Sequence, residues 1–184
     1  LPPDLFAEGL ARVGDELVQL TWREQVAVRS ALDSFEMVDS HRYEGEGWGL
    51  CFDGSRLVMS DGSSRLTFRR PDDLGVVGQV TVTVGSAPIA MINELECVGD
   101  RVVANVWQTD YILAIDPADG SVESIVDASD LLAPEERSRA DVLNGIAWRA
   151  SSGTFLITGK LWPKLFEVRF VPAPGPATTA APAP

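Results

Sequence analysis

Two positions in a repeated framework carry chemically different side chains in each repeat. The first position holds, in chain order, Glu8, Trp48, Asn93 and Asn144. The second position falls later in the same frame and holds Trp22, Gly62, Trp107 and Lys160. Together they offer an acid–base group, hydrogen-bonding carboxamides, an ammonium and apolar indole walls. These are the groups that a site for a small polar substrate needs.

The framework that carries these side chains is a fourfold repeat. Each repeat opens with a small-plus-apolar pair, and these pairs are Gly9-Leu10, Gly49-Leu50, Glu94-Leu95 and Gly145-Ile146. A turn then leads into an apolar strand at Leu17-Val18, Leu57-Val58 and Val102-Val103, at the same offset each time, and the fourth repeat reaches Phe155-Leu156 after two extra residues. A scaffold with no ligand would fill the two variable positions alike, so their divergence favours a shared site.

Short strands separated by Gly-Asp and Asp-Gly turns predict antiparallel sheets. The third repeat is the clearest, with strands expected over 95–97, 101–107, 110–115 and 121–126. A four-stranded sheet repeated about every 40 to 50 residues is typical of a β-propeller blade. We therefore predict an all-β propeller whose first strands lie nearest the axis, so that the two variable positions ring one end of it.

The propeller is expected over residues 1–171, and the Pro- and Ala-rich tail over 172–184 is expected to be disordered. The fourth repeat ends soon after its third strand at 165–171, so its outer strand should come from elsewhere. Residues 133–139 predict a short helix between the third and fourth blades, with Ser129-Asp130 as its cap. The sequence has neither an initiator Met nor a visible signal peptide, and we expect it to start inside a longer product.

Composition excludes several classes of function. A net charge of -12 argues against a nucleic-acid partner, because binding phosphates needs a basic face. No apolar run is long enough to span a membrane as a helix. His41 is the only histidine, which disfavours a Ser-His-Asp or Cys-His catalytic unit and a zinc site. Cys51 and Cys97 are interpreted as buried free thiols, with a disulfide as the alternative.

Several strings occur in an order that resembles the plant and bacterial type of glutaminyl-peptide cyclotransferase. They are Phe6-Ala7-Glu8-Gly9-Leu10, Gln19-Leu20-Thr21-Trp22, Gly45-Glu46-Gly47-Trp48-Gly49-Leu50, Ile92-Asn93-Glu94-Leu95-Glu96, Asn105-Val106-Trp107, Leu143-Asn144-Gly145-Ile146-Ala147-Trp148 and Thr158-Gly159-Lys160. The resemblance implies a five-bladed propeller that cyclises the N-terminal glutamine of peptides to pyroglutamate and releases ammonia, without a metal or other cofactor. It also implies an extracytoplasmic location, secreted or periplasmic, and we expect a monomer.

The resemblance assigns roles residue by residue. The family's catalytic glutamate matches Glu8, and Lys160 and Asn93 match its polar groups. The substrate-binding tryptophans match Trp22, Trp48 and Trp107, and Asn144 falls at the remaining ring position. The family also has a first blade with a Phe-Thr-Gln-Gly-Leu-type motif that this chain lacks, so four blades of five are expected here.

Other interpretations stay open at this point. The propeller could be a peptide- or sugar-binding module without catalysis, or an inactive truncated fragment. Each candidate residue also has a structural alternative, since Glu8 and Lys160 could be solvated, the tryptophans could fill the core, and Asn93 and Asn144 could serve turns. A glycosidase would need two acids across a cleft, and neither Glu46 nor Glu94 shares the ring position of Glu8.

Overall fold

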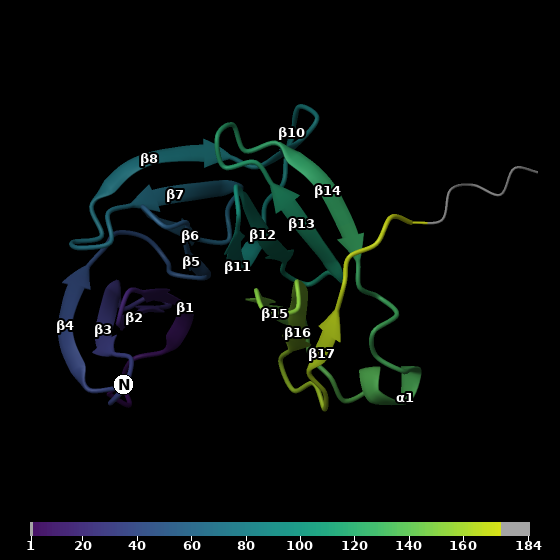
Figure 1. Cartoon of the computed structure of the whole chain (residues 1–184), viewed down its shortest axis with the longest axis horizontal. Helices are drawn as coiled ribbons and strands as arrows, with labels where there is room; N and C mark the ends of the chain where they lie inside the picture. The colour runs from purple at the N-terminus through teal and green to yellow at the C-terminus, as the bar shows by residue number, and fades with distance from the viewer. Residues whose placement is uncertain (1, 174–184) are drawn as a thin grey trace, which may run out of the picture.

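The computed structural model describes residues 2–173 and confirms an all-β fold built from four antiparallel sheets (Figure 1). The first sheet comprises β1 (Ala7–Val13), β2 (Glu16–Thr21), β3 (Val26–Ala31) and β4 (Met37–Arg42). The second comprises β5 (Leu50–Phe52), β6 (Leu57–Ser60), β7 (Arg65–Arg69) and β8 (Val76–Thr81). The third comprises β11 (Ile92–Val98), β12 (Arg101–Val106), β13 (Tyr111–Ile115) and β14 (Val122–Asp127). The fourth comprises β15 (Leu143–Arg149), β16 (Thr154–Gly159) and β17 (Phe166–Val168).

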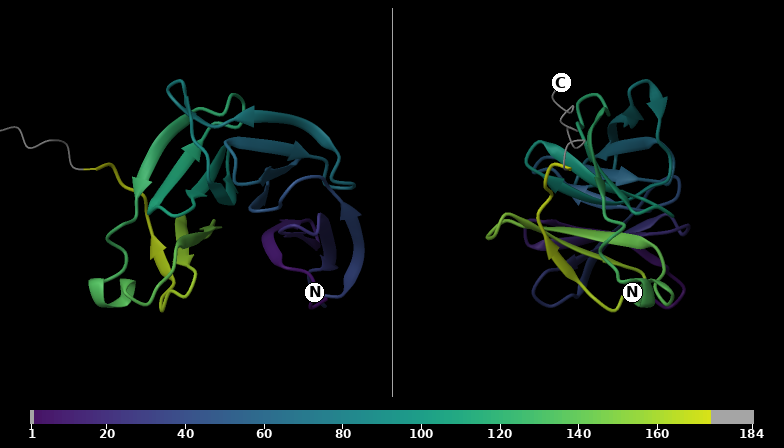
Figure 2. Two further views of the ribbon diagram at one scale, coloured as in Figure 1. Left: turned by 180° about the vertical axis from the view of Figure 1, so that it is seen from behind. Right: turned by 90° about the vertical axis from the view of Figure 1, so that its right-hand side faces the viewer.

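The sheets stand side by side as propeller blades along an arc. In each blade the strands follow one another in chain order, with β1, β5, β11 and β15 on the inside of the arc and β4, β8 and β14 at its rim (Figure 1). The four-stranded third blade confirms the prediction from the third repeat. Seen from behind, the first and fourth blades form the two ends of the arc (Figure 2).

The fourth blade has three strands within the described residues, and its third strand is shorter than the predicted 165–171. A small hairpin follows the second blade, formed by β9 (Thr83–Val84) and β10 (Ala87–Pro88). It meets the third blade through a parallel bridge between Thr83 and Ser121. The predicted tail over 172–184 lies outside the described residues except for its first two positions.

The hydrophobic cores lie between consecutive blades. Along β6, Leu57 and Met59 pack toward the first blade, whereas Val58 packs toward the third. Alternate residues of a strand point to opposite faces, so this strand is covered on both sides. All four residues of β6 are buried, which explains why the strand reads as a nearly continuous apolar run.

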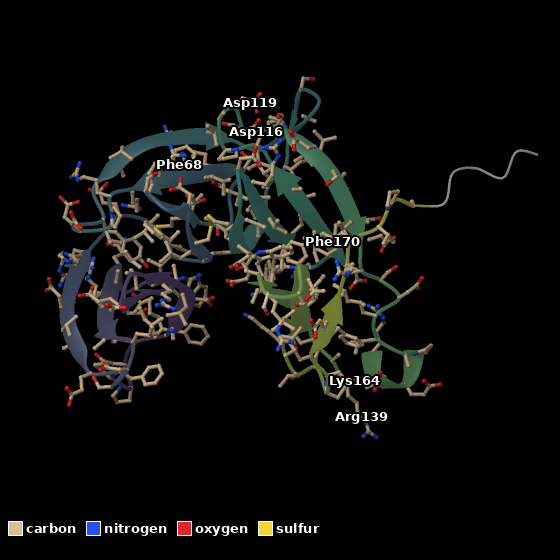
Figure 3. All side chains as sticks on the ribbon, viewed as in Figure 1. Phe68, Asp116, Asp119, Arg139, Lys164 and Phe170 are labelled. Atoms are coloured by element: carbon tan, nitrogen blue, oxygen red, sulfur yellow. A yellow bond between two sulfur atoms is a disulfide. The ribbon has the colours of Figure 1, made fainter. Side chains whose placement is uncertain are left out.

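The third core joins the last two blades and continues into the segment after β17. The ring of Phe170 stacks on Phe155 with centroids 4.3 Å apart and planes 10° apart. The chain from β17 runs on past β14 (Figure 1), and Phe170 lies on this segment (Figure 3). This stacking holds the segment after β17 against the blades.

The two cysteines form a disulfide, so the prediction of free thiols was wrong. Cys51 lies in β5 and Cys97 in β11, and their Cα atoms are 5.5 Å apart. Such a separation is typical of a disulfide. The bond joins the inner strands of two neighbouring blades, and that proximity depends on blade packing, which spacing along the chain does not reveal.

The single helix of the described residues, α1 (Pro134–Arg137), is shorter than the predicted 133–139. Its N-cap is Ala133 rather than Ser129-Asp130, and Pro134 occupies the first turn, where its missing N–H costs nothing. The Ser129 N–H instead donates to the Asp127 carboxylate at 2.9 Å, which forms a turn of its own. The helix does connect the third and fourth blades as predicted. No described helix is long and apolar enough to cross a membrane.

Candidate functional site

A β-bulge recurs in the first strand of three blades, and each time it contains a residue of the first variable position. In the first blade Ala7 pairs with Thr21, but Leu10 pairs with Gln19, so Glu8 and Gly9 together oppose one residue. The same shift occurs around Asn93 and around Asn144. A bulge re-aims the side chains that it contains. In the second blade β5 begins only at Leu50, so Trp48 precedes the strand.

The second variable position comes just after the second strand of each blade. The backbone N–H groups of Trp22, Trp107 and Lys160 donate to the carbonyls of Phe6, Met91 and Val142 at 2.9, 2.8 and 2.9 Å. The same hydrogen bond in three blades fixes these residues at equivalent places. Both variable positions therefore lie at the same end of the blades.

Tight packing of the inner strands explains the glycine that follows Glu8. The Gly9 N–H donates to the Trp48 carbonyl at 2.8 Å, and a Cβ on Gly9 would lie 2.6 Å from the Gly49 carbonyl carbon. Glu94 is the exception in this frame. Its backbone N–H donates to the Asn144 carboxamide oxygen at 3.4 Å, so that side chain contacts backbone within the site.

Two opposing effects act on the Glu8 carboxyl. Partial burial raises the pKa of the Glu8 carboxyl, and the nearby Lys160 ammonium lowers it again. Lys160 is exposed, whereas Glu8 is only partly exposed. A carboxyl group with a raised pKa can accept a proton and return it.

Asn93 is buried, with 5% of its surface exposed. Within residues 2–173 its side-chain oxygen has no hydrogen-bond partner, although its backbone carbonyl accepts from the Ser60 hydroxyl at 2.7 Å. Buried polar groups are usually paired, so this unpaired acceptor oxygen suits a ligand that donates a hydrogen bond.

The tryptophans form two contacts with other aromatic rings. Trp48 and Trp107 meet edge to face with centroids 5.5 Å apart, and Trp22 lies 5.9 Å from Phe6. The Trp48 ring also fills the space above Gly62, where a Cβ would lie 2.6 Å from the indole. This contact explains why the second variable position is glycine in the second blade.

Three carboxylates of this region were not predicted as site residues. Glu46 accepts hydrogen bonds from the indoles of both Trp22 and Trp48. Burial, followed by the charges of Glu96 and Glu8, raises the pKa of Glu94 to about 8. Burial also raises the pKa of Glu96, which accepts the Trp148 N–H at 3.0 Å. The repeat could have indicated Glu46 and Glu94, because each is a carboxylate at a position where the other repeats have none. Glu46 aligns with Phe6, Met91 and Val142, and Glu94 aligns with glycines.

Three surface cavities of the described residues are lined by other residues than these. One, of about 410 Å³, lies on the first blade beside Leu10 and Phe35. Another, of about 490 Å³, surrounds Arg69, and the third, of about 770 Å³, separates β14 from the segment after β17. The candidate site therefore rests on the convergence of functional groups rather than on cavity size.

The chain is similar to known proteins over nearly its whole length. The glutamine cyclotransferase family model matches residues 1–170. A glutaminyl-peptide cyclotransferase of Arabidopsis thaliana is 36% identical over 168 residues, which cover 89% of this chain and 52% of the plant protein. This chain thus spans about half the length of that curated relative.

Solved structures agree with this relationship. The crystal structure of Myxococcus xanthus glutaminyl cyclase matches with a TM-score of 0.83 and 44% identity, over 91% of this chain and 74% of that chain. The computationally designed Ika4 protein matches with a TM-score of 0.51 and 12% identity, over 90% of this chain and 93% of the designed one. At that identity the second match concerns the fold alone.

Proposed function

The chain belongs to the glutamine cyclotransferase family, and from that premise we propose that it converts the N-terminal glutamine of peptides to pyroglutamate with release of ammonia. The observation that carries the proposal is the Glu8 carboxyl on the β-bulge of β1, whose pKa is raised by partial burial and lowered by the charge of Lys160. The named relatives support the choice of reaction. The substrates are peptides or proteins that begin with Gln and carry a free α-amine.

In the proposed reaction the α-amine attacks the side-chain amide carbon of the same glutamine. Because both groups belong to one residue, orientation supplies much of the rate. The new C–N bond closes a lactam ring, and the C–N bond to the amide nitrogen breaks. The amine must lose a proton and the departing nitrogen must gain one, since an amide anion leaves poorly. Glu8 takes the first proton and then returns it to the leaving nitrogen.

The remaining groups have supporting roles. Lys160 and the side-chain amide N–H of Asn93 stabilise the carbonyl oxygen as it becomes negative. The unpaired carboxamide oxygen of Asn93 accepts a hydrogen bond from the substrate. The indoles of Trp22, Trp48 and Trp107 exclude water and hold the substrate ring. Asn144 contributes through Glu94, because its carboxamide oxygen accepts the Glu94 N–H.

The test is incubation of this chain with a Gln-initiated peptide and with the same peptide acetylated at its N-terminus. Ammonia release from the free peptide alone is the expected result, because acetylation removes the attacking amine. Binding of the free peptide without ammonia release would instead assign a binding module, and neither binding nor release would assign an inactive fragment.

The proposal extends to the location of the protein, which we place outside the cytoplasm. The Cys51–Cys97 disulfide supports this, because such bonds persist mainly in oxidising compartments. Detection of the native protein with both thiols reduced in a cytosolic fraction would contradict it.

A further inference from the structure

One carboxylate connects two of the tryptophans of the site. Oε2 of Glu46 accepts the indole N–H of Trp22 at 2.8 Å and that of Trp48 at 3.0 Å. Trp22 follows β2 in the first blade, whereas Trp48 leads into β5 of the second. A single oxygen therefore ties together side chains from two blades.

The other oxygen of Glu46 is held as well. Oε1 accepts from the Arg23 Nε at 3.1 Å, and the Arg23 guanidinium lies 3.8 Å from the centroid of the Trp22 ring. The Gly47 N–H donates to the Trp22 carbonyl at 2.9 Å, which anchors the Glu46 segment to the same turn. Charge-assisted hydrogen bonds of this kind are stronger than neutral ones, so the arrangement fixes both indoles.

The position of Glu46 in the repeat is unusual. Its equivalents are Phe6, Met91 and Val142, which are all apolar. An ionised side chain at this place is unnecessary for the blade, because the other three blades form without one. Its hydrogen bonds instead go to indoles at the candidate site.

We propose that Glu46 is a positioning residue that sets the binding site for the substrate glutamine by clamping Trp22 and Trp48. The inference rests on the proposed function. Glu46 acts by holding the indoles of Trp22 and Trp48 and touches no reacting atom. Its loss should therefore weaken substrate binding more than it slows the chemical step. Loss of the two hydrogen bonds loosens both indoles and should raise KM about 10-fold.

The test compares Glu46→Ala and Glu46→Gln with the unaltered chain, using KM and kcat for a Gln-initiated peptide and the indole N–H resonances in NMR spectra. Glu46→Ala should raise KM about 10-fold with a smaller change in kcat. It should also shift the indole resonances of Trp22 and Trp48. Glu46→Gln keeps an acceptor oxygen and should restore most of the loss.

Two controls accompany these variants. Glu44 lies two residues upstream and is exposed, and its carboxylate accepts no hydrogen bond within residues 2–173, so Glu44→Ala should change neither KM nor the indole resonances. The Trp162 indole donates to the Asp141 carbonyl at 2.9 Å, and its resonance is the internal reference for an intact fold.

The outcomes separate this inference from the proposed function. Unchanged KM and unchanged resonances of Trp22 and Trp48 in Glu46→Ala would overturn the clamp. A shift of the Trp162 resonance together with the other two would also overturn it, because the change would then be general. If the unaltered chain releases no ammonia, the proposed function fails, and the indole resonances alone then decide whether Glu46 holds the two rings.

Discussion

The Cys51–Cys97 disulfide should contribute a large part of the stability of this chain. It joins the inner strands of the second and third blades, next to the residues that carry the candidate site. We predict that reduction lowers the free energy of unfolding without changing which residues pack in the core. The bond acts mainly by restricting the unfolded chain.

The magnitude follows from the length of the loop that the bond closes. A sequence separation of 46 corresponds to roughly 4 kcal/mol at 25 °C in the chain-entropy treatment. For a chain of this size, that loss lowers Tm by about 8 to 16 °C. Domains are stable by only about 5 to 15 kcal/mol, so the reduced chain should be marginal.

The assay is urea unfolding of the oxidised and the reduced chain, followed by intrinsic fluorescence. The variant Cys51→Ala/Cys97→Ala is the control, because reductant should leave its unfolding midpoint unchanged. Two free thiols in the untreated, unfolded protein would refute the bond itself. A loss below about 1 kcal/mol after verified reduction would refute the loop-closure reasoning.

Three further predictions concern the site. Gly62→Ala should lower kcat/KM, because its Cβ would lie 2.6 Å from the Trp48 indole and its φ of +77° disfavours a side chain. Gly54→Ala is the control, because its Cβ meets open space. Equal effects of the two substitutions on kcat/KM would contradict a role for the Trp48 indole. Lys160→Met should move the acidic limb of the pH profile of kcat/KM to higher pH, because Lys160 lowers the pKa of Glu8 and its removal lets that pKa rise. An acidic limb at the same pH would show that the charge of Lys160 does not act on Glu8. Glu94 has a pKa of about 8 in the folded chain and an ordinary one when unfolded, so the folded state binds the extra proton and stability should fall as pH rises from about 4.5 to 8. Urea unfolding at pH 5 and pH 8 should show a smaller loss of unfolding free energy in Glu94→Gln than in the unaltered chain. An equal loss in both proteins would contradict the raised pKa of Glu94.

The sequence predicted the blades well because their signals are local and repeated. The strands of the third blade and the place of the helix follow from turn residues and alternation within about 35 residues. The predicted cap at Ser129-Asp130 was wrong, because the Asp127 carboxylate accepts the Ser129 N–H in a separate turn and the helix begins only after Ala133.

The parts of the site that depend on packing between blades were harder to predict. The frame singled out Glu8 and the tryptophans, yet it gave no reason to pair Cys51 with Cys97 or to bring Glu46 to two indoles. The disulfide and the hydrogen bond from Trp22 to Glu46 join residues far apart in the sequence, whose relative placement is a tertiary property. The residues were visible as departures from the repeat, but their partners were not.

The rate of pyroglutamate formation by Glu8→Gln, relative to the unaltered chain, tests the central claim most directly. The substitution preserves shape while removing the group that takes and returns the proton. We predict that kcat falls about 10²- to 10⁴-fold while KM for the Gln-initiated peptide changes little. Turnover within a fewfold of the unaltered chain would contradict the assignment of Glu8 as the acid–base group.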